Sequence, residues 1–132
     1  LIGIHISEGT NLPSGEKICD IKNIIDDQLL GVILSCVSPE NYAVNLDEIK
    51  YLGVPFGFKL NGFVTTKTHP IYTEKYLKSK TGNPVEVLGK REDLTPEKMA
   101  EIVKKFKDKG ATILGGCCET RPAHIREMAK LI

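Results

Sequence analysis

The stretch LTPEKMAEIVKKFKDKGATILGG, residues 94–116, decides the fold because a helical pattern runs directly into a strand pattern. Thr95 is a typical helix cap, Pro96 suits the first helical position and Gly110 is a typical helix end. One face of this helix is apolar: Met99, Ile102, Val103 and Phe106. ATILGG, residues 111–116, is short, aliphatic and rich in β-branched residues, so it predicts a buried strand after the helix.

The same pairing of strand and helix extends over the rest of the chain. Ser38 and Gly53 mark the start and end of one helix, and Ile18, Ile21 and Ile25 lie at helical spacing in another. The predicted elements are a strand at 1–7, a helix at 15–28, a strand at 29–36, a helix at 38–53, a strand at 55–62, a loop at 63–93, a helix at 95–110, a strand at 111–116 and a helix at 122–132. In the last helix, the residues expected to face inward are Ile125, Met128, Ala129 and Ile132.

Four strands that alternate with four helices predict an α/β fold of right-handed βαβ units around a parallel sheet. Such units form either an open doubly wound sheet or half of a (βα)₈ barrel, and periodicity alone does not separate the two. We treat residues 1–132 as a single partial domain. The loop at 63–93 is long for a compact domain, which is typical of functional loops.

Composition narrows the class of protein. The chain has 132 residues, 41% of them hydrophobic and 27% charged, with a net charge of +1. No lysine or arginine cluster is interleaved with aromatic residues, so we expect no nucleic-acid partner. No apolar run approaches the ~18 residues of a membrane span. Four cysteines in a chain of this kind are too sparse for a secreted disulfide framework, which favours the cytoplasm.

Three of the four cysteines fall at the ends of predicted strands. Cys36 ends the second strand, and Cys117 and Cys118 end the fourth. The carboxyl ends of parallel strands share one edge of the sheet, so we expect these thiols at one rim. Gly115 and Gly116 are expected to let the backbone bend so that both neighbouring sulfurs face one point. Three thiolates match a catalytic zinc site with one open position, but simple packing or a redox-active vicinal pair fits the same residues.

The remaining cysteine and the histidines have plainer interpretations. We interpret Cys19 as a packing residue on its helix. His124, in the first turn of the last helix, is expected to bond nearby backbone rather than a metal. His5 faces the barrel interior or packs in the first strand, and His69 is expected to be solvated in the long loop.

Three segments carry a family resemblance. GGCCETRPAHI, residues 115–125, resembles the carboxyl-terminal signature of the homocysteine S-methyltransferase family, in which Gly-Gly-Cys-Cys closes the eighth strand of a (βα)₈ barrel. GVILSCVSPENY, residues 31–42, is similar to the sixth-strand segment of that family, and PFGFKLNG, residues 55–62, is similar to the seventh. The resemblance covers essentially the whole chain as strands five to eight of the barrel.

The resemblance implies a zinc-dependent methyl transfer to the thiol of homocysteine, which forms methionine. It implies that zinc is held by Cys36, Cys117 and Cys118, with the homocysteine thiol as the incoming ligand. A zinc-bound thiol is deprotonated at neutral pH, and sulfur then attacks the activated methyl group of a small donor. The resemblance also implies a substrate-binding role for Asn61 at the rim, although an asparagine there also suits a turn.

Two residues depart from the family pattern, and half of the barrel has no counterpart. Ser35 stands where the family usually has asparagine, and Glu119 stands where glycine is common. We hold two hypotheses: the zinc-bearing half of a methyltransferase, and a non-catalytic zinc-binding or structural half-barrel. Because several strands are apolar on both sides, we expect the chain to form a homo-oligomer or to associate with an amino-terminal half.

Overall fold

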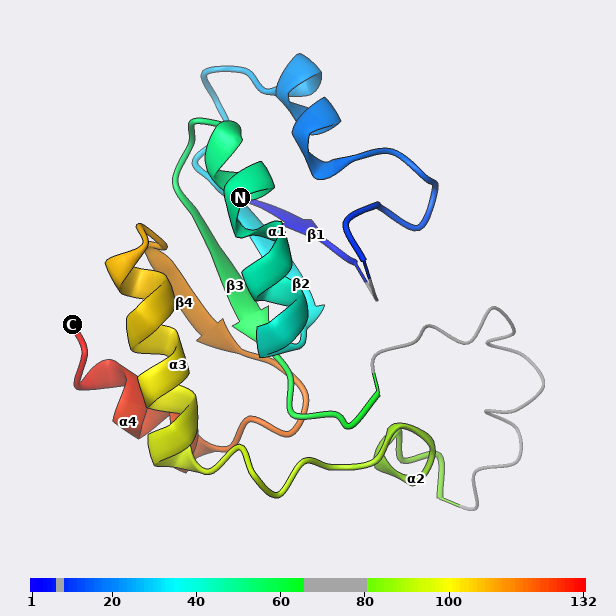
Figure 1. Ribbon diagram of the computed structural model, residues 1–132, viewed down its shortest axis with the longest axis vertical. Coiled ribbons are helices and arrows are strands. Elements are labelled where there is room, and N and C mark those ends of the chain that lie inside the picture. Colours follow the sequence, from blue (N-terminus) through cyan, green and yellow to red (C-terminus); the bar gives the residue numbers. More distant parts are fainter. Residues whose placement is uncertain (7–8, 66–80) are drawn as a thin grey trace.

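The computed structural model describes residues 1–6, 9–65 and 81–132, and it shows an α/β fold (Figure 1). Its sheet has four parallel strands in the order β1-β2-β3-β4. The strands are β1 (Ile2–Ile4), β2 (Val32–Val37), β3 (Phe56–Leu60) and β4 (Ile113–Gly116). The helices are η1 (Ile18–Ile24), α1 (Pro39–Tyr51), α2 (Val85–Leu88), α3 (Pro96–Asp108) and α4 (Pro122–Ala129).

Each strand lies beside the strand that precedes it in the chain, and a helical segment lies between successive strands. α1 contacts both β2 and β3, and α3 packs beside α4 (Figure 1). A sheet that follows the chain order has no point at which the strand order reverses, whereas doubly wound sheets have one. The topology is therefore consistent with four successive units of a (βα)₈ barrel. No helix in the described ranges is long and apolar enough to cross a bilayer.

The two long helices form where their caps predict them. The Ser38 hydroxyl accepts a hydrogen bond from the Asn41 backbone N–H at the start of α1, and the Thr95 hydroxyl accepts one from Lys98 at the start of α3. Both helices carry proline in their first turn. Gly110 follows α3 with φ of +106°, a left-handed conformation that favours glycine. These contacts confirm the predicted helices at 38–53 and 95–110.

The first helical segment is shorter and tighter than predicted. The residues between 15 and 28 form a 3₁₀ helix, η1, rather than an α-helix. Ile18 and Ile21 are its buried residues. Their spacing of three residues suits the three residues per turn of a 3₁₀ helix as well as it suits an α-helix, so the hydrophobic pattern alone did not separate the two.

The last helix turns a different face inward than predicted. α4 buries His124 and Met128, whereas Ile125 is 47% exposed and Ile132 is 94% exposed. Ala129 is exposed as well. The reason is that the His124 ring bonds the backbone on both sides, which turns its face of the helix toward α3. Of the four residues predicted to face inward, only Met128 is fully buried.

The long loop contains a helix that the periodicity did not reveal. α2 occupies four residues of the predicted loop at 63–93. The Asn83 side chain accepts a hydrogen bond from the Val85 backbone N–H, and Gly89 follows the helix with φ of +68°. Asn-Pro before and glycine after are the start and stop signals of a short helix, so the sequence did carry a signal for it. Residues 66–80 of this loop lie outside the described residues.

The sheet is buried on one face only. Two rows of paired residues face the helices and belong to the core: Val32 with Phe56, and Leu34 with Phe58. The alternate rows lie on the helix-free face: Gly3, Ile33, Gly57 and Ile113 in one row, and Ser35, Lys59 and Gly115 in the next. The second face of β2 and β4 carries Ile33 and Ile113, as the prediction for these strands requires, but Ser35 and Lys59 make this face less apolar than the face that packs on the helices.

Candidate metal centre

A β-bulge places Cys36 at the end of β2. In the pairing of β2 with β3, Ser35 lies opposite Lys59 and Val37 lies opposite Leu60, which leaves Cys36 as the extra residue. Its φ is +54°, a left-handed conformation that is rare for a residue with a β-carbon. A bulge re-aims one side chain out of the regular alternation of a strand. The Cys36 thiol consequently departs from the alternation that a regular strand would impose.

Backbone hydrogen bonds across the strand ends place Cys117 and Cys118 directly after β4. The Cys117 N–H donates to the Leu60 carbonyl at 2.7 Å, and the Cys118 carbonyl accepts from the Gly62 N–H at 2.9 Å. The Thr120 N–H donates to the Cys117 carbonyl at 3.1 Å, which closes a turn. The chain therefore leaves the strand at Cys117. In a regular strand the side chains of Cys117 and Cys118 would point to opposite faces, but in this turn they do not have to.

Gly115 and Gly116 were expected to let the backbone bend, and the structure shows that they do so without a left-handed conformation. Neither has a positive φ. A β-carbon on Gly116 would lie 2.2 Å from a side-chain carbon of Thr120, so this glycine makes room for the turn that carries the cysteines. The Thr120 hydroxyl in turn donates to the Leu60 carbonyl at 3.1 Å. The bend itself begins after the glycines.

The three predicted thiols form one cluster. The Sγ atoms of Cys36 and Cys118 lie 3.7 Å apart, those of Cys117 and Cys118 lie 3.9 Å apart, and all three lie within 4.8 Å of one another. Among the described residues, this is the single group of three or more histidine, cysteine, aspartate or glutamate side chains at metal-ligand spacing. The thiols lie partly open to solvent.

The cluster has the dimensions and the chemistry that zinc requires. Zinc–sulfur bonds of about 2.3 Å in tetrahedral geometry place sulfur atoms ~3.8 Å apart, close to the two shorter separations here. Burial is the main cause that raises the pKa of both the Cys36 and Cys118 thiols. The neighbouring sulfurs raise the pKa of Cys36 further, whereas at Cys118 the hydrogen bond from Cys36 partly offsets the rise. Three thiolates this close repel one another, so a bound cation would stabilise their deprotonated form. The residues fit a three-thiolate zinc site.

Asn61 lies beside the cluster and is bonded to it. Its amide NH₂ donates to the Cys36 carbonyl at 2.6 Å and approaches the Cys36 Sγ at 3.8 Å. Its carbonyl oxygen accepts from the Phe63 backbone N–H at 3.2 Å, and the residue is 1% exposed. The side chain thus combines the turn role with contact to a cluster cysteine. Its predicted role in substrate binding stays a prediction.

The other predicted candidates lie outside this cluster. Cys19 is part of η1 and half-buried. His124 accepts from the Arg121 backbone N–H at 3.0 Å through Nδ1, and its Nε2 lies 3.0 Å from the Leu94 carbonyl, as expected for a helix-terminal residue that bonds backbone. His5 is exposed, and its Nδ1 lies 3.3 Å from the Ser35 carbonyl. His69 falls outside the described residues.

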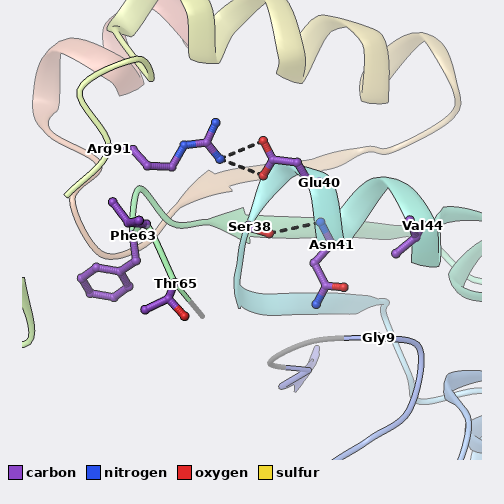
Figure 2. Close-up of a pocket in the computed structure, with 9 residues that line it drawn as sticks. Gly9, Ser38, Glu40, Asn41, Val44, Phe63, Thr65 and Arg91 are labelled. Atoms are coloured by element: carbon purple, nitrogen blue, oxygen red, sulfur yellow. Dashed lines mark hydrogen bonds and ion pairs between the residues drawn. The ribbon is translucent and has the colours of Figure 1, made fainter. Parts of the chain in front are cut away.

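Sequence reasoning missed Arg91, which lines two pockets. One pocket of about 480 Å³ lies over the start of α1 and the beginning of the long loop (Figure 2). A second, of about 230 Å³, lies between the end of that loop and the turn after β4. Arg91 lines both. An isolated arginine in a long loop has no periodic pattern around it, so its partners became visible only in the structure.

Comparison with known proteins gives the family. The family model described as homocysteine S-methyltransferase matches residues 1–132, which is the whole chain. The chain belongs to the homocysteine S-methyltransferase family. The sulfur cluster is built from the residues that the resemblance to this family singled out.

Three relatives within the homocysteine S-methyltransferase family are longer than this chain, which matches only part of each. Homocysteine S-methyltransferase 1 of Zea mays is 26% identical over 95% of this chain and 35% of the relative. Homocysteine S-methyltransferase 3 of Arabidopsis thaliana is 22% identical over 95% of the chain and 33% of the relative. Homocysteine S-methyltransferase 1 of Saccharomyces cerevisiae is 29% identical over 99% of the chain and 38% of the relative. The chain therefore spans between a third and two fifths of these relatives.

Proposed function

We propose that the complete protein transfers a methyl group from a small donor to the thiol of homocysteine and so forms methionine. In this proposal the described chain supplies the zinc ligands Cys36, Cys117 and Cys118. The observation that carries the proposal is the cluster of three sulfurs within 4.8 Å of one another, in a chain that belongs to this family. Related proteins with this activity in their names match over nearly all of the chain.

The chain's own residues would hold the metal and leave one position for the substrate. Cys36, Cys117 and Cys118 would bind as thiolates, so their protons are released when zinc enters. Zinc with three thiolate ligands and one open position lowers the pKa of a further thiol, which is the chemistry that it supplies. Asn61 would keep Cys36 oriented, because its amide already donates to the Cys36 carbonyl. We also propose that Asn61 contributes to binding of the substrate.

The transfer itself is a displacement at carbon. The sulfur of homocysteine forms a bond to the methyl carbon while the bond from that carbon to the donor breaks. The donor leaves with the electron pair of the broken bond, and the proton of the homocysteine thiol is released to solvent. Thiolate sulfur is the effective nucleophile, since a protonated thiol attacks weakly.

We further propose that the sheet is half of a (βα)₈ barrel, with β1 to β4 as its last four strands. The support is the strand order, which follows the chain, and the placement of α1, α3 and α4 on the same face of the described sheet (Figure 1). Completion of the barrel would come from an amino-terminal half or from a second copy of this chain. We place the protein in the cytoplasm, where reducing conditions keep cysteines available for metal binding.

A chimera tests the proposed activity. The segment of the Saccharomyces cerevisiae relative that matches this chain would be replaced by residues 1–132, and methionine formation from homocysteine would be measured with the donor that the relative uses. We expect activity that Cys117→Ser abolishes and Cys19→Ser preserves, because Cys19 lies outside the cluster. A folded, zinc-loaded chimera that forms no methionine would instead favour the non-catalytic half-barrel.

A further inference from the structure

The long loop after β3 is closed at its base by backbone pairing. Residues 62–65 run antiparallel to residues 88–91, with hydrogen bonds from the Thr65 N–H to the Leu88 carbonyl at 3.1 Å and from the Arg91 N–H to the Gly62 carbonyl at 2.8 Å. An isolated antiparallel bridge joins Phe63 and Lys90 between them. The two ends of the loop are therefore joined to each other as one unit.

Arg91 fastens this unit to the first turn of α1. Its Nη1 donates to both carboxylate oxygens of Glu40 at 2.8 Å, and its Nη2 and Nε donate to the two oxygens of Asp93 at 2.7 and 3.0 Å (Figure 2 shows the Glu40 pair). The Arg91 side chain is only 20% exposed. The two parallel bonds from Nε and Nη2 to Asp93 form a bidentate pair, which fixes the plane of the guanidinium group and keeps Nη1 directed at Glu40.

Arg91 is also linked to both segments that carry the cluster cysteines. On one side, its backbone bonds Gly62, and the Gly62 N–H donates to the Cys118 carbonyl at 2.9 Å. On the other side, Glu40 lies in the first turn of α1, whose cap Ser38 is two residues after Cys36. The guanidinium group therefore connects the segment that carries Cys36 to the segment that holds Cys118.

We propose that Arg91 is a positioning residue that sets the separation between the Cys36 and Cys118 sulfurs and thereby the zinc affinity of the cluster. The inference rests on the proposed function, since it takes these thiols to be metal ligands. It follows from contacts at both ends of the arginine rather than from a contact with the sulfurs. The clamp consists of Arg91 and Glu40.

Because Arg91 lines two pockets, few other contacts hold the start of α1 against the base of the loop at this place. Arg91 lines the pocket of about 480 Å³ and the pocket of about 230 Å³, so packed side chains do not back it on those sides. Without the ion pair, the start of α1 and the base of the loop can separate into these spaces. Groups that bond metal ligands directly typically contribute about 10–100-fold to metal affinity, and Arg91 acts through intervening residues, which places it at the lower end. We expect about a tenfold effect from this clamp.

The experiment measures zinc affinity by chelator competition and the visible spectrum of the Co²⁺-substituted chain. Arg91→Met removes the charge but keeps much of the apolar stem, and Glu40→Gln weakens the same clamp from α1 because it removes the carboxylate charge. Glu97→Gln is the matched control: Glu97 follows Pro96 in the first turn of α3 as Glu40 follows Pro39 in α1, and Glu97 is not bound to an arginine in the described structure. It removes the same charge from a helix start outside the clamp.

We expect both clamp variants to bind zinc about tenfold more weakly and to shift the Co²⁺ ligand-field band, which reports ligand geometry. Glu97→Gln should match the wild-type chain in both. If Arg91→Met does not fold, Glu40→Gln decides alone. Wild-type affinity and spectrum in the folded clamp variants would overturn the positioning role and leave the proposed function standing. Undiminished zinc binding in a variant that combines Cys36→Ser, Cys117→Ser and Cys118→Ser would overturn the proposed function and the clamp together.

Discussion

Cys36 shows best what single residues contribute and where sequence reasoning stops. Its position at a strand end was predictable from the apolar run before it, but its bulge and its φ of +54° were not. A bulge depends on how two strands register, which a sequence of one strand does not encode. A left-handed residue with a β-carbon costs roughly 1–2 kcal/mol, and such strain is concentrated at functional sites.

A second single residue, Tyr42, gives a prediction about stability. Its ring packs edge-to-face on Phe58 and Phe106, but its hydroxyl is buried with no hydrogen-bond partner among the described residues. Burial also raises the pKa of this phenol, as a hydroxyl cut off from water should show. An unsatisfied buried hydroxyl costs about 1–3 kcal/mol.

Tyr42→Phe should therefore raise the free energy of unfolding by about 1 kcal/mol, because it removes the hydroxyl and keeps the ring. Urea denaturation measures the change. Tyr51→Phe is the control, since the Tyr51 side chain is 61% exposed and should show no change. A loss of stability in Tyr42→Phe would show that the hydroxyl does find a partner.

Apart from glycines, Glu119 is the second described residue with a left-handed backbone, at φ of +59°. Substitution by glycine or alanine removes the ion pair with Arg121 equally, so the difference between the two variants isolates the backbone. Glycine adopts this conformation without a steric penalty. We expect Glu119→Gly to be about 1 kcal/mol more stable than Glu119→Ala in urea denaturation of the metal-free chain. Equal stabilities would mean that the turn relaxes freely.

At the scale of elements, local signals predicted α1 and α3 well and the remaining helices less well. Caps, prolines and glycines are chemically local, so Ser38 and Thr95 marked helix starts correctly. The face of α4 depends on His124, whose ring bonds a carbonyl thirty residues away. No pattern within α4 contains that partner, and the inward residues were wrong for that reason.

The contact between β3 and β4 depends on one glycine. A β-carbon on Gly57 would lie 1.7 Å from the Ile113 carbonyl oxygen, which the sheet cannot accept without separating the strands. Gly115 has ordinary space, with its nearest atom at 3.4 Å. Gly57→Ala should therefore lower the free energy of unfolding by several kcal/mol or prevent folding, whereas Gly115→Ala should change it little. Circular dichroism and urea denaturation compare them, and a stable Gly57→Ala would contradict the strand packing.

At the scale of the molecule, the family resemblance and the geometry point to the same site, at the carboxyl ends of the strands. The convergence of three thiols was predictable because parallel strands end at one edge, and the structure brings their sulfurs together. The clamp between Arg91 and Glu40 was not predictable, because its two residues are separated by fifty-one positions and lie in unrelated patterns. Long-range pairs of this kind require the fold itself.

The same open architecture predicts association. β1 and β4 are the edge strands of the described sheet, and its second face has no helix layer. That face is more polar than the sequence suggested, so we expect pairing chiefly through the strand edges, where backbone groups lack partners. Sedimentation equilibrium at micromolar concentration should show a dimer or larger species. A compact monomer of 14.6 kDa would contradict the half-barrel.

The most direct test of the account is the zinc content of the purified chain and its cysteine variants. We predict one zinc per chain, a sharp loss in Cys36→Ser, Cys117→Ser and Cys118→Ser, and no loss in Cys19→Ser, because only the first three thiols converge. Metal analysis after reduction and dialysis against zinc gives the answer. Equal zinc content in all four variants, or an equal loss in all four, would contradict the three-thiolate centre.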